Sequence, residues 1–541
     1  MQQKINNDTN DFLHRCTKAQ KSLDTFLTLS KEAVLTLTVS TDHKDTQFIR
    51  HGFAWQASLV SAFSTIIQWI QLLQAQQQVR TFELAVANAA AAEIISGLVH
   101  GIDMSQLETF RPAHIAVNTD VLNTLNDLLH NDNHADLTTI AQALHTGQAQ
   151  THTGLDDSLT MVADQFCSFS DTNICPFAQR WHLENTLIPD TLIEQLGELG
   201  VFGLTIDEQY GGAGFGKLAM CVVTEELSRG YIGVGSLGTR SEIAAELIQH
   251  AGTEAQQQKY LSGIASGKIL PTAVFTEPDT GSDLGALTSR AIKNDDGSWS
   301  ITGNKTWITH ASRSDLMTML VRTDSNSTDH RGLSMLLIDK QRGTDSDPFP
   351  DCAMNGSEIE VLGYRGMREY DLAFDGFTAP QSALLGNREG QGFKQLMTTF
   401  ESARIQTAAR AVGVARNACE LATSYAQERK QFGQPLIRFE RVYRKLARMV
   451  VDTEIARQMT YAAARRKDQG QRCDVEAGMA KLLAARAAWS CADGALQIHG
   501  GMGYALEHPV SRLLCDARIL SVFEGTSEIQ GEVIARRLLS S

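Results

Sequence analysis

Five short segments of this chain combine residue types that could bind a cofactor or move a proton. In chain order they are residues 276–283 (TEPDTGSD), 305–309 (KTWIT), 429–433 (RKQFG), 497–504 (QIHGGMGY) and 523–530 (FEGTSEIQ). Taken alone, each segment also has an ordinary structural explanation. The informative feature is that all five occur in one chain and in this order.

The last segment offers a candidate proton acceptor. Glu524 lies in an apolar context, after Ile519 and Leu520 and before Gly525. A surface carboxylate is the ordinary interpretation. The alternative is a base in a dry pocket, because desolvation raises the pKa of a carboxylate toward the range in which it can accept a proton.

The segments at 276–283 and 305–309 could hold a flat, charged cofactor. Small residues with N–H groups and hydroxyls, placed where a strand enters a loop, suit a phosphate or the polar edge of a ring. Trp307 could stack on an aromatic ring, and Thr309 could hydrogen-bond to its edge. The alternatives are a polar turn after a strand and a tryptophan in the core of a β domain.

The remaining two segments follow predicted helices. Arg429 and Lys430 lie where the helix dipole favours cations in any case. The paired glycines Gly500 and Gly501 either allow a ligand to approach the backbone closely or only cap a helix.

The spacing of apolar residues predicts the elements that position these segments. Residues 1–150 are expected to be helical, with dense helix formers at 53–74 and 82–102. A polar linker around one short helix is expected at 131–154, and helical patterns return from 156 to 266.

The second half of the chain changes from strands to helices. Alternating segments at 270–276, 298–309, 316–322 and 333–338 predict a β domain that ends near Pro380. Beyond it, apolar residues repeat at helical spacing from Ile405 to Tyr425, and three further helical stretches follow. Four helices in succession predict an antiparallel bundle, so the expected fold class is α+β.

Composition and charge exclude several classes of protein. The chain is 43% hydrophobic and 20% charged, which excludes disorder as a description of the whole. Its net charge of −14 opposes nucleic acid and anionic membranes as general partners. The nine cysteines show no CxxC spacing, so we expect reduced thiols and no metal site. The N-terminus is polar and lacks the apolar core of a signal peptide, so we expect a cytoplasmic location.

From about residue 155 to its C-terminus, the chain resembles the acyl-CoA dehydrogenase family of flavoenzymes, because the five motifs above occur in that family's order. The resemblance implies a helical domain, a β barrel-like middle domain and a C-terminal four-helix bundle, with FAD held between the β domain and the bundle. The expected segments are a helical N-terminal extension at 1–150, the helical domain at 151–268, the β domain at 269–382 and the bundle domain at 383–541.

The resemblance also implies which residues meet the cofactor and the substrate. The flavin ring would lie along Phe275, Thr276, Trp307 and Thr309, and its pyrophosphate near Gly281 and Ser282. The adenosine-diphosphate half would meet Thr526 and Glu528. The FAD of a neighbouring subunit would be reached by Arg429, Phe432, Gln497, Gly500 and Gly501. The acyl-CoA would lie near Ser282, Arg404 and Gly525.

The family places its catalytic glutamate either in the motif at 523–530 or on the first bundle helix. In this chain Glu524 fills the first position and Ala403 occupies the second, so the resemblance makes Glu524 the single base. It would remove the α-proton of an acyl-CoA thioester while flavin N5 accepts the β-hydride. Two positions depart from the family pattern, since Phe523 replaces the more usual Tyr and Glu440 stands where Gln is frequent.

Family members form homo-oligomers and pass electrons to electron-transfer flavoprotein. The resemblance therefore implies a homodimer or homotetramer, with electron-transfer flavoprotein as the electron acceptor.

One charged residue, Arg240, bears on the chemical identity of the acyl group. The floor of the substrate pocket is expected from residues 233–241, where simple fatty-acyl enzymes need apolar side chains and this chain has Arg240. A substrate carboxylate could pair with Arg240 through two hydrogen bonds. The alternative is an ion pair with Glu242 or Glu246. The whole pattern, including the extension and residues 363–377, is similar to family members that oxidise (2S)-methylsuccinyl-CoA to mesaconyl-CoA in the ethylmalonyl-CoA pathway.

Three alternatives remain open within the same fold. One is dehydrogenation of a short- or branched-chain acyl-CoA. A DNA-associated flavoprotein is opposed by the net charge of −14 and the lack of a basic tail. A flavin monooxygenase is opposed by Glu524, because such enzymes usually lack the glutamate base.

Overall fold

The computed structural model describes every residue except 1, 41–45, 119, 123–124, 126–132 and 541. Its internal contacts form two compact units, Met1–Asp164 with Thr407–Ser541, and Gln165–Gln406. Helices α6 (Asp157–Asn173) and α12 (Gly392–Glu428) each run from one unit into the other. The four segment boundaries expected from the sequence stay predictions.

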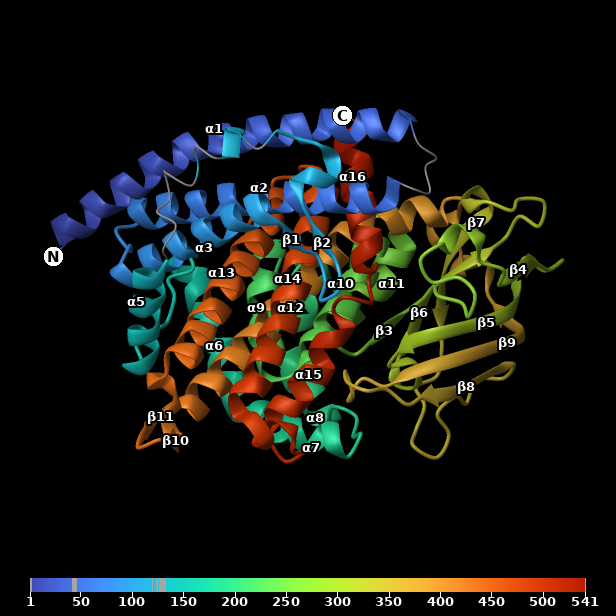
Figure 1. The fold of residues 1–541 in the computed structure, drawn as a ribbon. Coiled ribbons are helices and arrows are strands. Elements are labelled where there is room, and N and C mark those ends of the chain that lie inside the picture. Colours follow the sequence, from blue (N-terminus) through green and yellow to red (C-terminus); the bar gives the residue numbers. More distant parts are fainter. Residues whose placement is uncertain (1, 41–45, 119, 123–124, 126–132, 541) are drawn as a thin grey trace. The chain divides into compact units, whose positions relative to one another are not determined.

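The first unit begins with long helices, as the composition predicts. These are α1 (Gln2–Ser40), α2 (Gln47–Ala75) and α3 (Thr81–His100), with α2 packed against both of its neighbours (Figure 1). The shorter α5 (His134–His145) lies within the expected linker. Helix α2 is buried around most of its circumference, which is typical of a central core helix. Helix α3 is the one helix of the described chain that is long and apolar enough to cross a membrane, and 67% of its apolar window is buried inside the protein.

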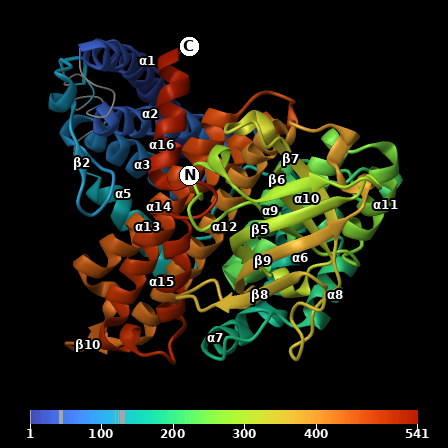
Figure 2. The same cartoon turned by 90° about the vertical axis from the view of Figure 1, so that its right-hand side faces the viewer.

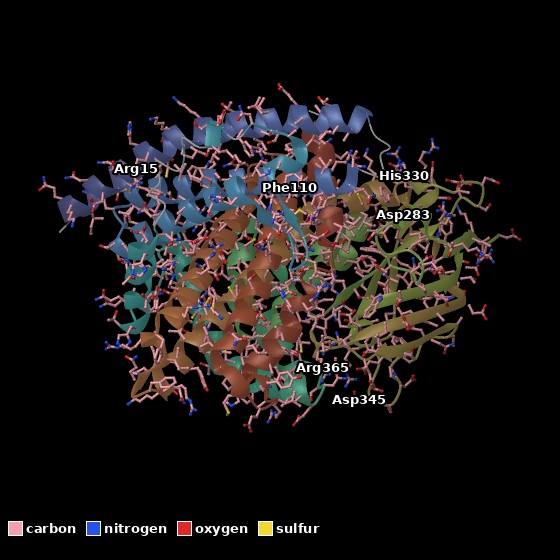
Figure 3. All side chains as sticks on the ribbon, viewed as in Figure 1. Arg15, Phe110, Asp283, His330, Asp345 and Arg365 are labelled. Carbon is pink, nitrogen blue, oxygen red and sulfur yellow. The ribbon has the colours of Figure 1, made fainter. Side chains whose placement is uncertain are left out.

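A small hairpin after α3 was not predicted. Strand β1 (Ile102–Asp103) pairs with β2 (Thr109–Phe110) in antiparallel register. The ring of Phe110, labelled in Figure 3, lies against the bare Cα of Gly52 in α2, where a Cβ would be 2.0 Å from Phe110 Cδ2. Glycine is needed at position 52 because of this close approach.

The C-terminal part of the first unit is helical, as predicted. After α12 come α13 (Glu440–Asp468), α14 (Asp474–His499), α15 (Pro509–Ile519) and α16 (Ser527–Ser540). A hairpin of β10 (Lys430–Gln431) and β11 (Gln434–Pro435) separates α12 from α13. Pro509 begins α15, where the missing N–H of proline removes no helical hydrogen bond.

The second unit contains the helices that precede the sheet. They are α7 (Cys175–Leu183), α8 (Asp190–Glu198), α9 (Lys217–Gly230), α10 (Ile232–Ala251) and α11 (Glu254–Ala265). Helix α11 begins with a capping box, in which Thr253 Oγ1 accepts from the Gln256 N–H at 3.3 Å and Gln256 Oε1 accepts from the Thr253 N–H at 3.0 Å.

Seven strands form one curled sheet in the second unit. They are β3 (Pro271–Val274), β4 (Arg290–Lys293), β5 (Trp299–Thr309), β6 (Leu316–Arg322), β7 (Leu333–Asp339), β8 (Met354–Ile359) and β9 (Glu369–Ala379). The order in space is β3-β6-β4-β5-β9-β8, and β7 also pairs with β6. Figure 2 shows β6, β5, β9 and β8 in this order across the sheet. The predicted strands correspond to β3, β5, β6 and β7, whereas β4, β8 and β9 were missed.

Strand β6 is buried on both faces and separates two apolar clusters. Leu316 and Leu320 pack with residues of α10 and α11. Met317 and Met319 point to the other face and pack with Trp299 and further residues of the sheet. This alternation follows from the two-residue period of a strand.

A buried ion pair anchors the end of β5. The side chain of Lys305 is fully buried, and its Nζ lies 3.0 Å from Glu277 Oε1 and donates to the carbonyls of Phe275 (3.0 Å) and Leu320 (2.8 Å). Two backbone N–H groups also donate to the Glu277 carboxylate, at 2.7 and 2.9 Å. Burial alone would raise the pKa of Glu277, but the Lys305 charge and these hydrogen bonds outweigh it and lower the pKa to about 2.

Replacing Glu277 with Gln should destabilise the protein strongly. The buried Lys305 ammonium would lose its counter-charge, so we expect the free energy of unfolding to fall by about 3 kcal/mol. Denaturant unfolding followed by tryptophan fluorescence measures the loss. The double variant Glu277→Gln/Lys305→Met should recover much of it, because the buried charge is then absent. Equal stability of wild type and Glu277→Gln would contradict this role.

His310 directly follows β5 and is buried. Its Nε2 lies 2.9 Å from the carbonyl of Pro271. Burial, together with the charges of Arg313 and Arg240, lowers the pKa of His310 from 6.5 to about 3. In the unfolded chain the ring binds a proton below about pH 6.5, whereas the folded chain resists protonation to about pH 3. The stability contributed by the neutral ring is therefore complete above pH 6.5 and is lost as the pH falls toward 3.

His310→Gln should remove this part of the acid sensitivity while keeping a donor for the Pro271 carbonyl. Between pH 6 and 4 the free energy of unfolding of the wild type should fall more steeply than that of the variant, by up to about 1.4 kcal/mol per pH unit. Denaturant titrations at several pH values supply both slopes. Parallel slopes for the two proteins would count against a neutral, buried His310.

Candidate functional site

Three residues of the predicted motifs other than glycine have a left-handed backbone. The φ angles are +58° at Trp307, +51° at Phe432 and +55° at Glu524. For bulky L-residues this conformation is rare and costs roughly 1–3 kcal/mol. It persists only where the surrounding structure enforces it, and such positions cluster at functional sites.

In the second unit, the loop after β3 meets the end of β5. The backbone N–H of Thr306 donates to the carbonyl of Thr276 at 3.0 Å. The loop then turns back tightly, so that a Cβ at Gly281 would lie 3.9 Å from the Thr276 methyl group. The structure therefore brings Phe275, Thr276 and Gly281 together beside Trp307.

Trp307 lies on a bulge of β5. The register of β5 against β9 shifts between Lys305 and Ile308, and the Trp307 side chain is 54% exposed. It is therefore not a core residue of the β domain. An exposed indole beside a loop of small polar residues suits stacking on a flat ring. Thr309 is turned inward, with its hydroxyl donating to Glu369 Oε1 at 3.0 Å.

Two further predicted residues lie in the second unit. Ser282 is exposed in the loop that follows β3. Arg404 lies on α12, with its Cζ 5.8 Å from the ring centroid of Phe400. Their contacts with cofactor and substrate stay predictions.

Arg240 lies on α10 and is buried. Lys217 Nζ lies 2.6 Å from Glu242 Oε1 and 3.1 Å from Glu246 Oε2. The pairing of Arg240 with a substrate carboxylate stays a prediction. The charge of Arg240 contributes to the lowered pKa of His310, which places the guanidinium near that ring.

In the first unit, Glu524 lies in the turn between α15 and α16. Gln530 Nε2 donates to the carbonyls of Glu524 (3.1 Å) and Gly525 (3.3 Å), and Lys481 Nζ donates to the carbonyl of Gly525 at 2.6 Å. Both donors are fully buried. They fix the direction of two successive carbonyls, while the Glu524 side chain stays partly exposed.

The start of α16 carries two of the predicted cofactor contacts. Thr526 Oγ1 accepts from the Ile529 N–H at 3.3 Å. Burial would raise the pKa of Glu528, but hydrogen bonds from its own backbone N–H and from Thr526, together with the charges of His51 and Lys481, outweigh burial and lower the pKa. His51 of the extension is thus close to a predicted cofactor residue.

The ends of α12 and α14 form a second cluster in the first unit. The ring of Tyr425 stacks on His499, with centroids 4.2 Å apart. Phe432 is 92% exposed. No described atom lies within 4 Å of a Cβ built on Gly500 or Gly501, so their backbone is open to another molecule.

The two clusters of the first unit lie at opposite ends of α14. Gln497 is 16 residues beyond Lys481 on this helix, which corresponds to about 24 Å at about 1.5 Å per residue. Gln497 and Arg429 are both exposed. The expectation that the two clusters serve the cofactors of different subunits stays a prediction.

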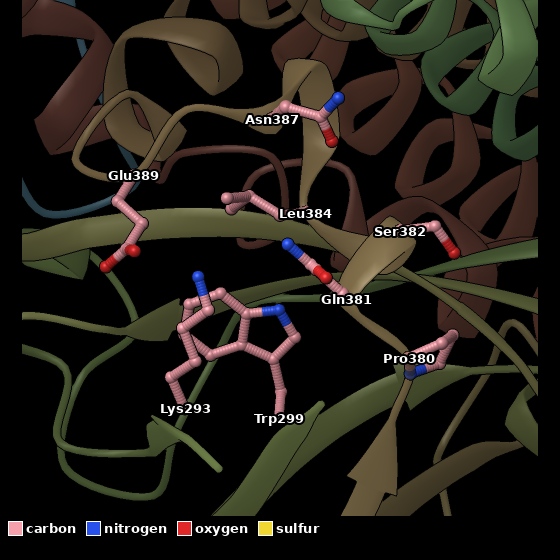
Figure 4. Close-up of a pocket in the computed structure, with 8 residues that line it drawn as sticks. All are labelled: Lys293, Trp299, Pro380, Gln381, Ser382, Leu384, Asn387 and Glu389. Carbon is pink, nitrogen blue, oxygen red and sulfur yellow. The ribbon is translucent and has the colours of Figure 1, made fainter. Parts of the chain in front are cut away.

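A pocket of about 700 Å³ lies elsewhere, at the start of β5 (Figure 4). It is lined by Lys293, Trp299, Pro380, Gln381, Ser382, Leu384, Asn387 and Glu389. None of the predicted site residues lines it. Trp299 and Trp307 are eight residues apart on β5, or about 26 Å along the strand, so this pocket is distinct from the region around Trp307.

The chemistry of the predicted residues suits a large, flat cofactor that carries phosphate groups. They include an exposed indole, a loop with small hydroxyl-bearing residues, and glycine backbones open to a ligand. The described part of the chain has no group of three or more His, Cys, Asp or Glu side chains that could hold a metal ion. The residues present therefore fit FAD.

Three residues that support Glu524 were missed in the sequence. Lys481 and Arg410 each interrupt an alanine-rich helical stretch, and a buried cation on such a face is the signal that could have revealed them. Arg410 covers the ring of Phe523, with its Cζ 4.7 Å from the centroid. Gln530 lies within the motif, but the direction of its side chain cannot be predicted from the sequence.

Family models cover most of the chain. The acyl-CoA dehydrogenase N-terminal domain matches residues 156–268, the middle domain 272–377 and the C-terminal domain 390–539. The chain is 54% identical over 512 residues to a (2S)-methylsuccinyl-CoA dehydrogenase from Cereibacter sphaeroides, covering 92% of this chain and 91% of that protein.

Solved structures agree with this match. Butyryl-CoA dehydrogenase from Megasphaera elsdenii is 31% identical with a TM-score of 0.67, covering 72% of this chain and 100% of that one. A glutaryl-CoA dehydrogenase from Mycobacterium smegmatis in complex with FADH2 is 27% identical with a TM-score of 0.65, covering 72% of this chain and 96% of that one. The chain therefore belongs to the acyl-CoA dehydrogenase family and is an FAD-dependent enzyme that dehydrogenates acyl-CoA thioesters.

Proposed function

We propose that this chain oxidises (2S)-methylsuccinyl-CoA to mesaconyl-CoA in the ethylmalonyl-CoA pathway, with Glu524 as the base that takes the α-proton. The observation that carries the base assignment is the turn at Glu524, whose strained backbone is held by two buried donors while the residue stays partly exposed. The relative named for this reaction, at 54% identity over 92% of the chain, supports the substrate.

The turn gives Glu524 two tasks. Its carboxylate accepts the α-proton, and its backbone N–H donates to the thioester oxygen, on which negative charge develops as the proton leaves. One rigid turn therefore positions both the base and the hydrogen-bond donor. FAD, when bound, supplies the acceptor for the β-hydride.

The proposed cofactor contacts are grouped by the part of FAD that each residue would meet. The flavin ring is assigned to Phe275, Thr276, Trp307 and Thr309, the pyrophosphate to Gly281 and Ser282, and the adenosine-diphosphate half to Thr526 and Glu528. The exposed indole of Trp307 and its left-handed backbone support the first set most strongly.

The acyl group is assigned from Arg240. Its guanidinium is buried on α10, where a charge-assisted pair is shielded from water. The terminal carboxylate of methylsuccinyl-CoA would bind it through two hydrogen bonds. Arg404 and Gly525 are assigned to the same substrate.

The assembly is proposed to be a homo-oligomer. Arg429, Phe432, Gln497, Gly500 and Gly501 are assigned to the FAD of a neighbouring subunit. The 92% exposure of Phe432 and the distance of Gln497 from Lys481 along α14 support the assignment. Electron-transfer flavoprotein is the proposed electron acceptor. A cytoplasmic location is proposed from the nine free cysteines.

Glu524→Gln should retain FAD and lose turnover. The amide keeps the shape of the side chain but accepts no proton, so kcat with methylsuccinyl-CoA should fall by about 10³-fold or more. The flavin absorbance of the purified variant gives its FAD content, and a coupled dye assay gives kcat. Glu507→Gln, at an exposed position, is the control and should behave as wild type. Wild-type turnover in Glu524→Gln would refute the assignment.

Arg240→Ala should change substrate preference. Loss of a buried charge partner costs about 3 kcal/mol, so kcat/KM should fall about 100-fold with methylsuccinyl-CoA. With butyryl-CoA, which lacks the terminal carboxylate, the loss should stay below about tenfold. Steady-state kinetics with both substrates measure the two ratios. Equal losses would remove Arg240 from the substrate site and favour the short-chain alternative.

A further inference from the structure

The N-terminal extension reaches the helix that carries the cofactor-binding segment. Helix α2 packs against α16 within the first unit (Figure 1). Helix α16 begins at Ser527, directly after Gly525 and Thr526. It has 14 residues and packs against α2 and α14. These side contacts with other helices position it.

An ion pair forms the first of these contacts. Arg50 on α2 binds Glu532 on α16 through two hydrogen bonds, one of them from Nε to Oε2 at 3.0 Å. The Arg50 side chain is 11% exposed and that of Glu532 is 39% exposed, so the pair is partly shielded from water. Two parallel bonds between a guanidinium and a carboxylate also fix the orientation of the two helices.

A close approach of His51 to Gly531 forms the second contact. A Cβ built on Gly531 would lie 2.0 Å from His51 Nδ1, so the imidazole occupies space that only glycine leaves open. The ring is held from its other side, because Trp55 Nε1 donates to His51 Nε2 at 3.1 Å. Arg486 on α14 in turn lies over the Trp55 ring, with its Cζ 5.3 Å from the centroid.

We propose that Arg50 and His51 of the N-terminal extension are positioning residues for the FAD site, because they hold the first turns of α16 and with them Thr526, Glu528 and the turn at Glu524. The contacts at Gly531 and Glu532 lie one turn beyond Glu528 on the same helix. A shift of α16 would also move Gln530, which binds the carbonyls of Glu524 and Gly525. The inference rests on the proposed function, in which Thr526 and Glu528 meet the cofactor.

The test uses the full chain in its apo form, titrated with FAD and followed by flavin fluorescence. Gly531→Ala places a methyl group against His51, so the dissociation constant for FAD should rise about tenfold, although alanine favours helix more than glycine does. Adding His51→Ala removes the obstructing ring and should restore part of the affinity, because Arg50 still binds Glu532 on α16. The matched control is Gly97→Ala in α3, whose Cβ would meet Leu59 at an ordinary 3.5 Å and should leave FAD binding unchanged.

A milder variant keeps the proposal testable if Gly531→Ala does not fold. Arg50→Ala should weaken FAD binding and lower kcat at saturating FAD, and Arg50→Lys should recover part of both. Glu93→Gln removes a different ion pair of the extension, to Arg448 on α13, and should leave FAD affinity unchanged. The proposal is overturned if folded Gly531→Ala binds FAD as tightly as the wild type. It is also overturned if adding His51→Ala to Gly531→Ala restores no FAD affinity, or if Glu93→Gln weakens FAD binding as much as Arg50→Ala does.

The variant Thr526→Ala shows whether a negative result concerns the positioning role of Arg50 and His51 or the proposed cofactor contact itself. Reduced FAD affinity in Thr526→Ala with unchanged affinity in the Gly531 and Arg50 variants would overturn the positioning role alone. Unchanged affinity in Thr526→Ala would remove the assigned cofactor contact and the inference that rests on it. Weaker binding in all three variants is the result that we expect.

Discussion

The candidate site depends on tertiary contacts that hold Glu524 in a backbone conformation that a free peptide avoids. Glu524 has a φ of +55°, and the two carbonyls from Glu524 and Gly525 accept hydrogen bonds from buried Lys481 and Gln530. Burial makes each of these bonds costly to break, because the donors have no water to replace the lost partner. The strain at Glu524 is therefore maintained by groups that belong to α14 and α16.

The same principle applies at Trp307 in the second unit, which also has a left-handed backbone. Trp307 follows the buried Lys305, whose ammonium is bound by Glu277 and two carbonyls, and it precedes strand pairing that resumes at Ile308. The indole is exposed because its backbone is fixed on both sides of the bulge. In both units, buried side chains thus fix the backbone beside a functional side chain that is itself partly exposed.

The sequence predicted the helices and the chemistry better than the sheet. Long helices such as α2 and α3 are rich in strong helix formers, and the motif at 523–530 located Glu524 through the family resemblance. Strand β8 was missed because its residues, MNGSEI, are mostly exposed and show no apolar alternation. Strand β4 has only four residues, too few for a periodic signal. The left-handed residues also could not be predicted, because a positive φ at a tryptophan or glutamate is imposed by tertiary contacts.

In the proposed reaction Glu524 removes the α-proton, and proton exchange tests this step apart from oxidation. An acyl-CoA with sulfur in place of its β-carbon can lose an α-proton but has no β-hydride to transfer. In D₂O, the FAD-loaded wild type should exchange the α-hydrogens of this compound for deuterium, as mass spectrometry would show, and Glu524→Gln with full FAD content should not. Exchange by Glu524→Gln at the wild-type rate would contradict the claim.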